Sequence, residues 1–394
     1  MACAAILKPG HHSTEAPVSI LFEKFHQNNL SSKNRLVRSA TFECLYKNQN
    51  FDQLVTLYEK LSAAEVGILI TGLFAVNHNG LAGHMYDIKD PRVVEQLPRL
   101  SEACHKHHTK IIMQINHVGR QTFPQILKQG PPKSASAVFD SVFNVTPDPM
   151  TLEEINQTMN DYIDAGVKAY QAGYDGVQIH GAHGYLISQF LSPHLNLRQD
   201  GYGGDTESRT RLAREIALGI KAQTSPDFSV GIKINSHDFY SDGIDEKEFL
   251  AIIKLFNGLY DFVEVSAGTI ESNKHFTDYY SFENFSYYHA SAKKAKAVYE
   301  GVVILVGNNR SYSMCESVLQ NQEADMLSFS RGLIAEPDLL LRWKKGDTSN
   351  SKCTRCNTCV SKIYTDTPMQ CWVYSRPDFY PYAQEITNNT YDVK

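Results

Sequence analysis

Two histidines and a tyrosine stand close together just after an apolar run of this sequence. The run, Gly176–Ile179, is short enough for a buried strand, and His180, His183 and Tyr185 follow it among glycines that let a ligand approach the backbone. An imidazole can hydrogen-bond a substrate oxygen, and a phenol can deliver a proton without carrying charge. One such side chain at a strand end would usually only pack there, but three of them together predict a catalytic site.

The sequence around these residues reads IHGAHGYLISQFLSPHLNLRQDGYGG and continues into ESRTRLAREI. It resembles the old yellow enzyme family of FMN-dependent NADH:flavin oxidoreductases, and the resemblance extends over about residues 21–343. The resemblance implies that His180 and His183 hold a carbonyl or nitro oxygen of the substrate over the flavin. It also implies that Tyr185 is the proton donor.

Polar residues at the ends of other apolar runs could hold a flavin. Gln114 offers both an amide donor and an acceptor to the pyrimidine edge, and Lys233 offers a positive charge near it. Backbone N–H groups of Gly307–Asn309 and the Ser330–Arg331 pair could bind a phosphate, as the last two loops of α/β barrels often do. Each residue alone is more often structural, but their joint placement favours a flavin nucleotide.

Four further motifs resemble FMN-binding segments of the same family: NRLVRSATF, GILITG, QINHVGRQ and EADMLSFSRGLIAEPDL. The FMN contacts that we expect from the residues and the resemblance together are Ser39, Ala40, Thr41, Gly72, Gln114, Lys233, Gly307, Asn308, Ser330 and Arg331. Two positions depart from the family pattern. Lys233 stands where relatives more often have Arg, and Phe42 stands where many have Thr or Cys beside the flavin O4.

Eight short apolar runs alternate with segments of helical periodicity along the chain. Continuous apolar strands are typical of a parallel sheet that is buried on both faces, and the alternation predicts an α/β fold, a single-domain (β/α)8 TIM barrel. A doubly wound sheet would need a glycine-rich phosphate loop after its first strand, and the sequence has none there. The predicted strands are 34–40, 66–71, 110–115, 176–180, 229–235, 261–266, 302–306 and 326–330.

The helical patterns include residues 91–108 and a helix that begins at the capping box Thr151–Glu154 and runs to about Gln171. We expect a lead-in over residues 1–20, the FMN-binding barrel over 21–345 and a cysteine-containing tail over 346–394. A Pro/Ser/Gly-rich interruption, Pro124–Pro149, is typical of a functional loop or an inserted hairpin. The aromatic loop Phe276–Tyr288 either borders the mouth of the barrel or forms a packed lid.

Four cysteines are crowded into the tail at a spacing suited to a [4Fe–4S] cluster or a zinc site: Cys353, Cys356, Cys359 and Cys371. The segment KCTRCNTCV resembles the iron–sulfur segment of longer family members, such as trimethylamine dehydrogenase and 2,4-dienoyl-CoA reductase. Those relatives carry downstream flavin and nucleotide domains, whereas this sequence ends at Lys394, so we expect no redox partner for a cluster within it. A metal-free tail held by packing is the alternative.

Composition narrows the class of protein. A net charge of −5 and a pI near 6.3 give no electrostatic case for nucleic acid or a membrane surface. The sequence has neither a membrane-length apolar run nor a basic, apolar leader, so we expect a cytoplasmic protein. Eight cysteines in a chain of this length do not indicate a disulfide framework.

The resemblance implies an ene-reductase that uses NAD(P)H as co-substrate. Hydride would pass by way of the flavin to the β-carbon of an α,β-unsaturated carbonyl or nitro compound, and Tyr185 would protonate the α-carbon. The cysteines leave open an amine dehydrogenase or demethylase that uses an iron–sulfur site. A barrel retained as a binding or scaffold protein is the third hypothesis, and it would hold no FMN.

Overall fold

A computed structural model describes residues 19–45, 51–83, 85–123, 125, 127, 130–272, 286–362 and 367–381. Most of the expected lead-in, residues 1–18, lies outside the described residues, and so does the expected aromatic loop except for residues 286–288. Within the described part, no helix is long and apolar enough to cross a membrane.

Eight parallel strands close into a barrel, which confirms the predicted fold. Each strand pairs with the next along the chain, and the last strand pairs with the first. The strands are β3 (Leu36–Arg38), β4 (Ile68–Ala75), β6 (Lys110–Asn116), β9 (Gly176–Gly181), β10 (Ser229–Asn235), β11 (Phe262–Ser266), β12 (Val302–Val306) and β13 (Met326–Phe329). A short strand, β5 (Tyr86–Asp87), also pairs with β4.

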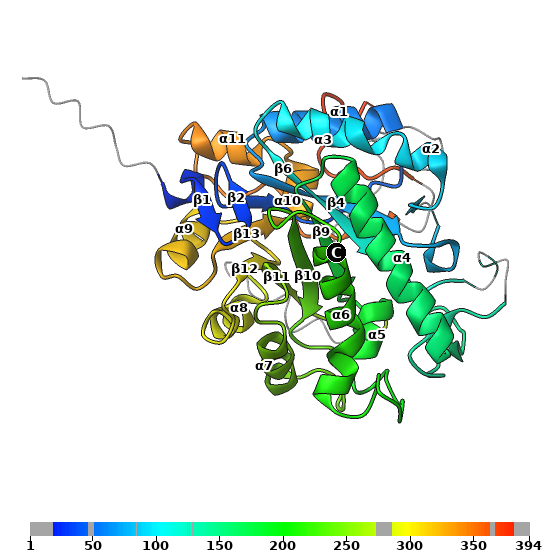
Figure 1. Ribbon diagram of the computed structural model, residues 1–394. Coiled ribbons are helices and arrows are strands. Elements are labelled where there is room, and N and C mark those ends of the chain that lie inside the picture. The colour runs from blue at the N-terminus through cyan, green and yellow to red at the C-terminus, as the bar shows by residue number, and fades with distance from the viewer. Residues whose placement is uncertain are drawn as a thin grey trace, which may run out of the picture.

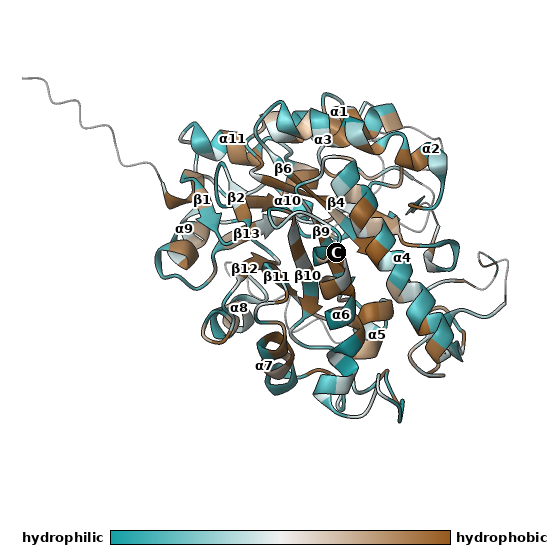
Figure 2. Cartoon of the chain, in the orientation of Figure 1, coloured by the Kyte–Doolittle hydropathy of each residue, from teal (hydrophilic) through white to brown (hydrophobic). Residues whose placement is uncertain are grey.

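Helices surround the barrel on its outer side (Figure 1). The longer ones are α1 (Phe51–Ala63), α3 (Leu97–His105), α4 (Leu152–Gln171), α6 (Thr206–Lys221), α7 (Glu246–Leu255), α8 (His289–Lys296) and α9 (Tyr312–Gln320). Shorter ones are α2 (Pro91–Val94), α5 (Leu186–Leu191), α10 (Arg331–Ala335), α11 (Leu339–Lys344) and α12 (Thr358–Ser361), with 3-10 turns η1 (Ile20–Phe22) and η3 (His78–Gly80). Figure 2 shows brown and teal alternating along α4, as expected for a helix with one face on the barrel.

The single helix predicted over residues 91–108 is wrong, because the structure divides this segment into α2 and α3. Proline stands in the first turn of both helices, as Pro91 in α2 and Pro98 in α3. A proline has no backbone N–H to donate, so it is accommodated in the first turn of a helix and disfavoured in the interior of one. The amphipathic spacing runs through both helices and therefore concealed the break.

In its described residues, the interruption at 124–149 contains two short strands, β7 (Lys133–Ser134) and β8 (Asp148–Pro149), which pair with each other in parallel. Between them, Asp140 and Val145 form an antiparallel bridge. Arg120, which follows β6, donates hydrogen bonds from Nη1 to the carbonyl oxygens of Val138 and Phe139, at 3.0 and 2.8 Å. The segment is therefore a long loop tied to the end of the third barrel strand.

The predicted capping box at the start of α4 is present. The Glu154 N–H donates to Thr151 Oγ1 at 3.1 Å, and the Thr151 N–H donates to Glu154 Oε2 at 2.8 Å. We expect Thr151→Ala to lower the free energy of unfolding by about 1 kcal/mol in urea denaturation, because the first turn loses its cap. The control is Thr56→Ala, an exposed interior position of α1 where alanine improves helix propensity. Equal stability of the two variants would contradict the capping role.

The inside of the barrel is built in levels. At its amino-terminal end, a hairpin of β1 (Phe25–Gln27) and β2 (Leu30–Ser32) contributes Phe25 and Leu30 to an apolar cluster with inward-facing strand residues such as Ile112 and Phe262. Side chains two residues further along the strands form the next level, and they are polar. This polar layer consists of Ser39, Gln114, Gln178, Lys233, Glu264 and Ser328, all of them buried.

Candidate active site

The predicted histidines and tyrosine meet at the carboxyl end of β9. The rings of His180 and His183 have centroids 5.0 Å apart, and those of His180 and Tyr185 are 4.8 Å apart. Tyr185 is the N-cap residue of α5, a helix that the sequence analysis did not predict. The structure therefore brings the three side chains together at the end of the barrel where α/β barrels carry their chemistry.

Hydrogen bonds hold the turn that carries His183. Its backbone has φ +63°, and its N–H donates to Asn235 Oδ1 on β10 at 3.1 Å. Its Nε2 lies 2.8 Å from Ser266 Oγ at the end of β11. Contacts to two neighbouring strands thus fix the position of this imidazole relative to the barrel.

Both histidines are neutral near pH 7. Burial and, to a smaller extent, the nearby Lys233 ammonium lower the pKa of His183 to about 3. Burial, His183 and Lys233 also hold the pKa of His180 well below its ordinary value. A neutral imidazole can donate one hydrogen bond to a substrate oxygen without adding a positive charge to the site.

These neutral histidines predict acid lability. Their folded pKa values lie below the unfolded ones, so the stability that they contribute is present above about pH 6.5 and is lost as the pH falls toward about 3 for His183. His117, whose pKa burial lowers to about 4, acts in the same direction. Each group can cost up to about 1.4 kcal/mol per pH unit in that window. Urea unfolding at several pH values gives the free energy of unfolding as a function of pH. In His117→Asn the slope of this curve should be smaller by about one bound proton than in the wild type, and equal slopes would contradict the role of His117.

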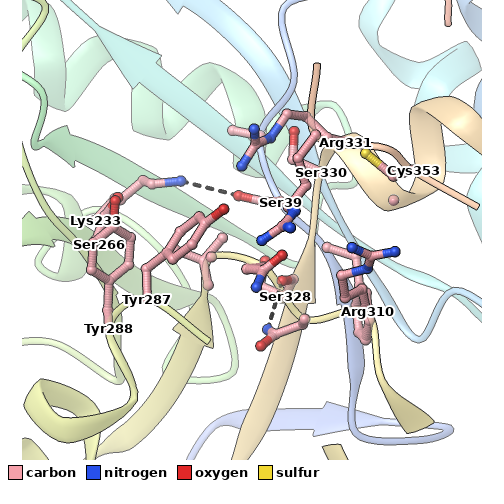
Figure 3. Close-up of a pocket in the computed structure, with 18 of the residues that line it drawn as sticks. Ser39, Lys233, Ser266, Tyr287, Tyr288, Arg310, Ser328, Ser330, Arg331 and Cys353 are labelled. Atoms are coloured by element: carbon pink, nitrogen blue, oxygen red, sulfur yellow. Dashed lines mark hydrogen bonds between the residues drawn. The ribbon is translucent and has the colours of Figure 1, made fainter. Parts of the chain in front are cut away.

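A cavity of about 280 Å³ (Figure 3) has His183 in its lining, but not His180 or Tyr185. Figure 3 shows Lys233, Ser266 and the two tyrosines on one side, and Arg310, Arg331 and Cys353 on the other. Of the predicted site residues, the lining includes Ser39, Ala40, His183, Lys233, Gly307, Asn308, Ser330 and Arg331. Gly307 has φ +106°, a conformation that favours glycine, so the turn after β12 depends on this residue type.

The remaining predicted contacts, Thr41, Gly72 and Gln114, are not among the residues that line this cavity. Thr41 lies within 3.2 Å of Ser330, oxygen to oxygen, and Phe42 packs in a cluster that also contains Tyr185. Gly72 lies away from the cavity lining, where its N–H donates to Tyr58 Oη at 3.2 Å. Gln114 is buried in the polar layer. The FMN contacts of these residues stay predictions.

Sequence reasoning missed Glu264 and Gln178, which organise the polar layer. The Glu264 carboxylate is fully buried and accepts hydrogen bonds from Ser39 Oγ and Ser328 Oγ, both at 2.7 Å. Lys233 Nζ lies 3.4 Å from Glu264 Oε2 and donates to Ser39 Oγ at 3.0 Å. The positive charge of Lys233, which we expected to face a flavin, is therefore partly balanced by the Glu264 carboxylate inside the barrel. A glutamate within an otherwise apolar strand was the available signal.

The residues fit a flavin nucleotide on two observations. Gln114 Oε1 is buried without a hydrogen-bond partner, and a buried acceptor of this kind is satisfied by a ring N–H such as that of a flavin pyrimidine. At the far end of the cavity, Arg310 and Arg331 stand beside the Gly307–Asn308 turn and can balance a phosphate charge. The first observation corresponds to the pyrimidine edge of FMN and the second to its phosphate, although Gln114 lies in the polar layer and not in the cavity lining.

The tail also reaches the cavity, which was not predicted. Cys353 and Arg355 belong to its lining. The Ser351 N–H donates to the Arg310 carbonyl oxygen at 2.8 Å, and Arg331 Nη1 donates to Asn357 Oδ1. The tail segment 351–357 thus packs against the loops after β12 and β13.

The cysteines are not arranged as a metal centre. Within the described ranges, which include all four tail cysteines, no three or more His, Cys, Asp or Glu side chains are gathered closely enough to hold a metal ion. Burial raises the pKa of Cys359 to about 11, although Arg331 acts in the opposite direction, so this thiol is protonated. Because metal binding itself displaces thiol protons, this pKa does not decide whether the cysteines hold a metal, and the iron–sulfur or zinc site stays a prediction.

Comparison with known proteins agrees with a flavin oxidoreductase barrel. The model of the NADH:flavin oxidoreductase / NADH oxidase family matches residues 20–350. An NADPH dehydrogenase of Clostridium acetobutylicum is 30% identical over 82% of this chain and 93% of its own length. An NADH oxidase of Thermoanaerobacter brockii is 31% identical over 90% of this chain, but this chain spans only 55% of that protein.

Solved structures share the fold. A 2-naphthoyl-CoA reductase in complex with 2-naphthoyl-CoA superposes with a TM-score of 0.82 at 23% identity, over 92% of this chain and 58% of the other. A histamine dehydrogenase from Rhizobium sp. 4-9 gives a TM-score of 0.80 at 21% identity, over 90% and 52%. The fold is a (β/α)8 barrel, and the family match makes it the barrel of a flavin-dependent oxidoreductase. The chain belongs to the NADH:flavin oxidoreductase / NADH oxidase family, which implies FMN and NAD(P)H as its cofactors.

Proposed function

We propose that this protein is an ene-reductase, which reduces the C=C bond of an α,β-unsaturated carbonyl or nitro compound at the expense of NAD(P)H. The observation that carries the proposal is the neutral His180/His183 pair packed against Tyr185 at the end of β9. Two imidazole donors and a phenol are the groups needed to hold a carbonyl oxygen and protonate the neighbouring carbon.

Each residue has a definite task in this reaction. When bound, FMN supplies hydride transfer between NAD(P)H and the alkene. His180 and His183 donate hydrogen bonds to the substrate oxygen and stabilise the negative charge that develops on it. Tyr185 gives its proton to the α-carbon, and Ser266 and Asn235 keep His183 in place. The surrounding burial excludes water and strengthens these contacts.

The experiment that tests the proposal is anaerobic spectroscopy of the purified protein. Bound FMN should bleach when NADPH or NADH is added, and its absorption should return when 2-cyclohexenone is added without oxygen. Return of the absorption only with oxygen would contradict the ene-reductase function and leave an NAD(P)H oxidase. A colourless protein that takes up no added FMN would overturn the flavin assignment altogether.

Amine oxidation is the second candidate function, and two observations favour it. An N,N-dimethylglycine/sarcosine dehydrogenase of Chromohalobacter salexigens is 25% identical over 89% of this chain, and Cys353 lines the cavity. In this case a secondary or tertiary amine, rather than NAD(P)H, should bleach the flavin. Iron and acid-labile sulfide analysis would accompany the titration, because the predicted [4Fe–4S] or zinc site at Cys353, Cys356, Cys359 and Cys371 stays a prediction.

The proposed phosphate end of the cavity predicts selectivity for FMN over riboflavin. We expect Arg331→Ala to weaken FMN binding by about 10- to 100-fold, because a charge-assisted hydrogen bond is lost, and to leave riboflavin binding almost unchanged. Dissociation constants from flavin fluorescence would measure both. Arg99→Ala, on the outer helix α3, is the control and should alter neither. An equal loss for both flavins would contradict a phosphate contact and indicate a structural role.

A further inference from the structure

The Glu264 carboxylate lies at the centre of a hydrogen-bonded group inside the barrel. It is 0% exposed, and four donors converge on it, three from barrel strands and one from Ser39 directly after β3. Ser39 Oγ and Ser328 Oγ approach Oε1 at 2.7 Å, while Gln178 Nε2 at 2.9 Å and Lys233 Nζ at 3.4 Å approach Oε2. Every oxygen of the carboxylate is therefore saturated by side chains of the polar layer.

This carboxylate determines which way two amides point. An ionised carboxylate can only accept hydrogen bonds, so Gln178 must turn its NH₂ group toward Glu264 and its carbonyl oxygen away. That oxygen, Gln178 Oε1, lies 2.7 Å from Gln114 Nε2, and it can only accept. Gln114 must therefore donate inward, which leaves its own Oε1 on the outer side, buried and without a hydrogen-bond partner.

The chain of hydrogen bonds from Gln114 through Gln178 to Glu264 is called the relay below. Its donors and acceptors keep this direction only while Glu264 stays ionised. Burial alone would raise the pKa of its carboxyl group, but Lys233 and the hydrogen bonds from Ser39, Ser328 and Gln178 outweigh burial and hold the pKa below its ordinary value. A protonated carboxyl, or a glutamine in its place, could both donate and accept. Either change would remove the constraint on the two amides.

We infer that Glu264 is a positioning residue for the cofactor: through Gln178 it orients the Gln114 amide so that the carbonyl oxygen, not the NH₂ group, is offered to the N3–H of the FMN pyrimidine. This inference rests on the proposed function, since it requires FMN in the cavity. Ring N3–H is a donor, and an NH₂ group facing it would leave both donors unpaired in a dry site.

The relay can be tested by NMR of ¹⁵N-labelled FMN bound to the full-length protein. In the wild type, the N3–H proton should be shifted downfield and exchange slowly with water. In Glu264→Gln we expect exchange that is at least about tenfold faster, because Gln114 is free to turn. Gln178→Met breaks the relay while leaving the Glu264 charge in place, and it should have the same effect. Methionine has nearly the same volume as the glutamine that it replaces and is also uncharged, so Gln178→Met should fold normally.

Glu336→Gln is the matched control. Glu336 is also buried and ion-paired, with its Oε1 2.6 Å from Arg342 Nε, but it lies outside the cavity lining, so the N3–H signal should not change. An unchanged signal in Gln178→Met would overturn the inference, whether or not Glu264→Gln folds. A wild type that binds FMN with an unprotected N3–H would overturn the inference alone. A wild type that binds no FMN would overturn the proposed function as well.

Discussion

Tyr185→Phe should slow the reoxidation of the reduced flavin by an enone by about 10²- to 10⁴-fold, because the substrate carbanion loses its proton donor. Reduction by NAD(P)H should stay within about twofold of the wild type, since that half-reaction needs no proton from the protein. Tyr185 stands beside His180, with ring centroids 4.8 Å apart, and caps α5, so the loss of one oxygen should leave the ring packing intact. Anaerobic stopped-flow absorbance would measure the two half-reactions separately.

Tyr170→Phe provides the comparison for this variant. Tyr170 is 40% exposed and packs edge-on against Phe228 on the outer side of the barrel, so its hydroxyl should not affect either half-reaction. Equal losses in both half-reactions of Tyr185→Phe would show that the tyrosine supports flavin binding or folding. The proton donor would then have to be another group or water.

His180→Ala should slow the same oxidative half-reaction by about 10²- to 10³-fold, the usual cost of removing one donor from a developing oxyanion. The two imidazoles stand with ring centroids 5.0 Å apart, so they can hydrogen-bond one oxygen jointly. Tighter binding of a phenol ligand to the wild type than to the variant would give a second measure, because a phenolate is a stable mimic of the charged oxygen.

The low histidine pKa values add a pH dependence to this prediction. Because burial keeps His180 and His183 neutral, the oxidative half-reaction should not titrate with a histidine-like pKa between about pH 6 and pH 8. A rate that falls with an apparent pKa of about 6.5 would indicate that one imidazole must carry charge. His105→Ala, on the outer helix α3, is the control and should react at the wild-type rate.

Local patterns were enough for the barrel strands and for placing His180, His183 and Tyr185 together at the end of β9. The barrel strands are continuous apolar runs because both faces are buried, and such runs can be recognised without knowing their neighbours. The capping box at Thr151 is equally local, since its two hydrogen bonds join residues three apart. His180, His183 and Tyr185 were found for the same reason, because a single turn carries all three.

Contacts between distant segments could not be predicted in this way. Glu264 looked like one charged residue in an apolar strand, and only the pairing of the strands and the closure of the barrel bring it to Ser39, Gln178 and Lys233. The expected tail over residues 346–394 likewise offered no sign that Cys353 and Arg355 would line the cavity.

The sequence by itself therefore determined the barrel and the meeting of His180, His183 and Tyr185 at one strand end, because each depends on residues near one another in the chain, while the flavin contacts at the other strand ends stay predictions. Only the tertiary structure decided which hydrogen bonds join the polar layer and that the tail segment 351–357 packs beside the cavity. Those features depend on strand register around a closed barrel and on long-range packing of the tail, and neither leaves a periodic signal in the sequence.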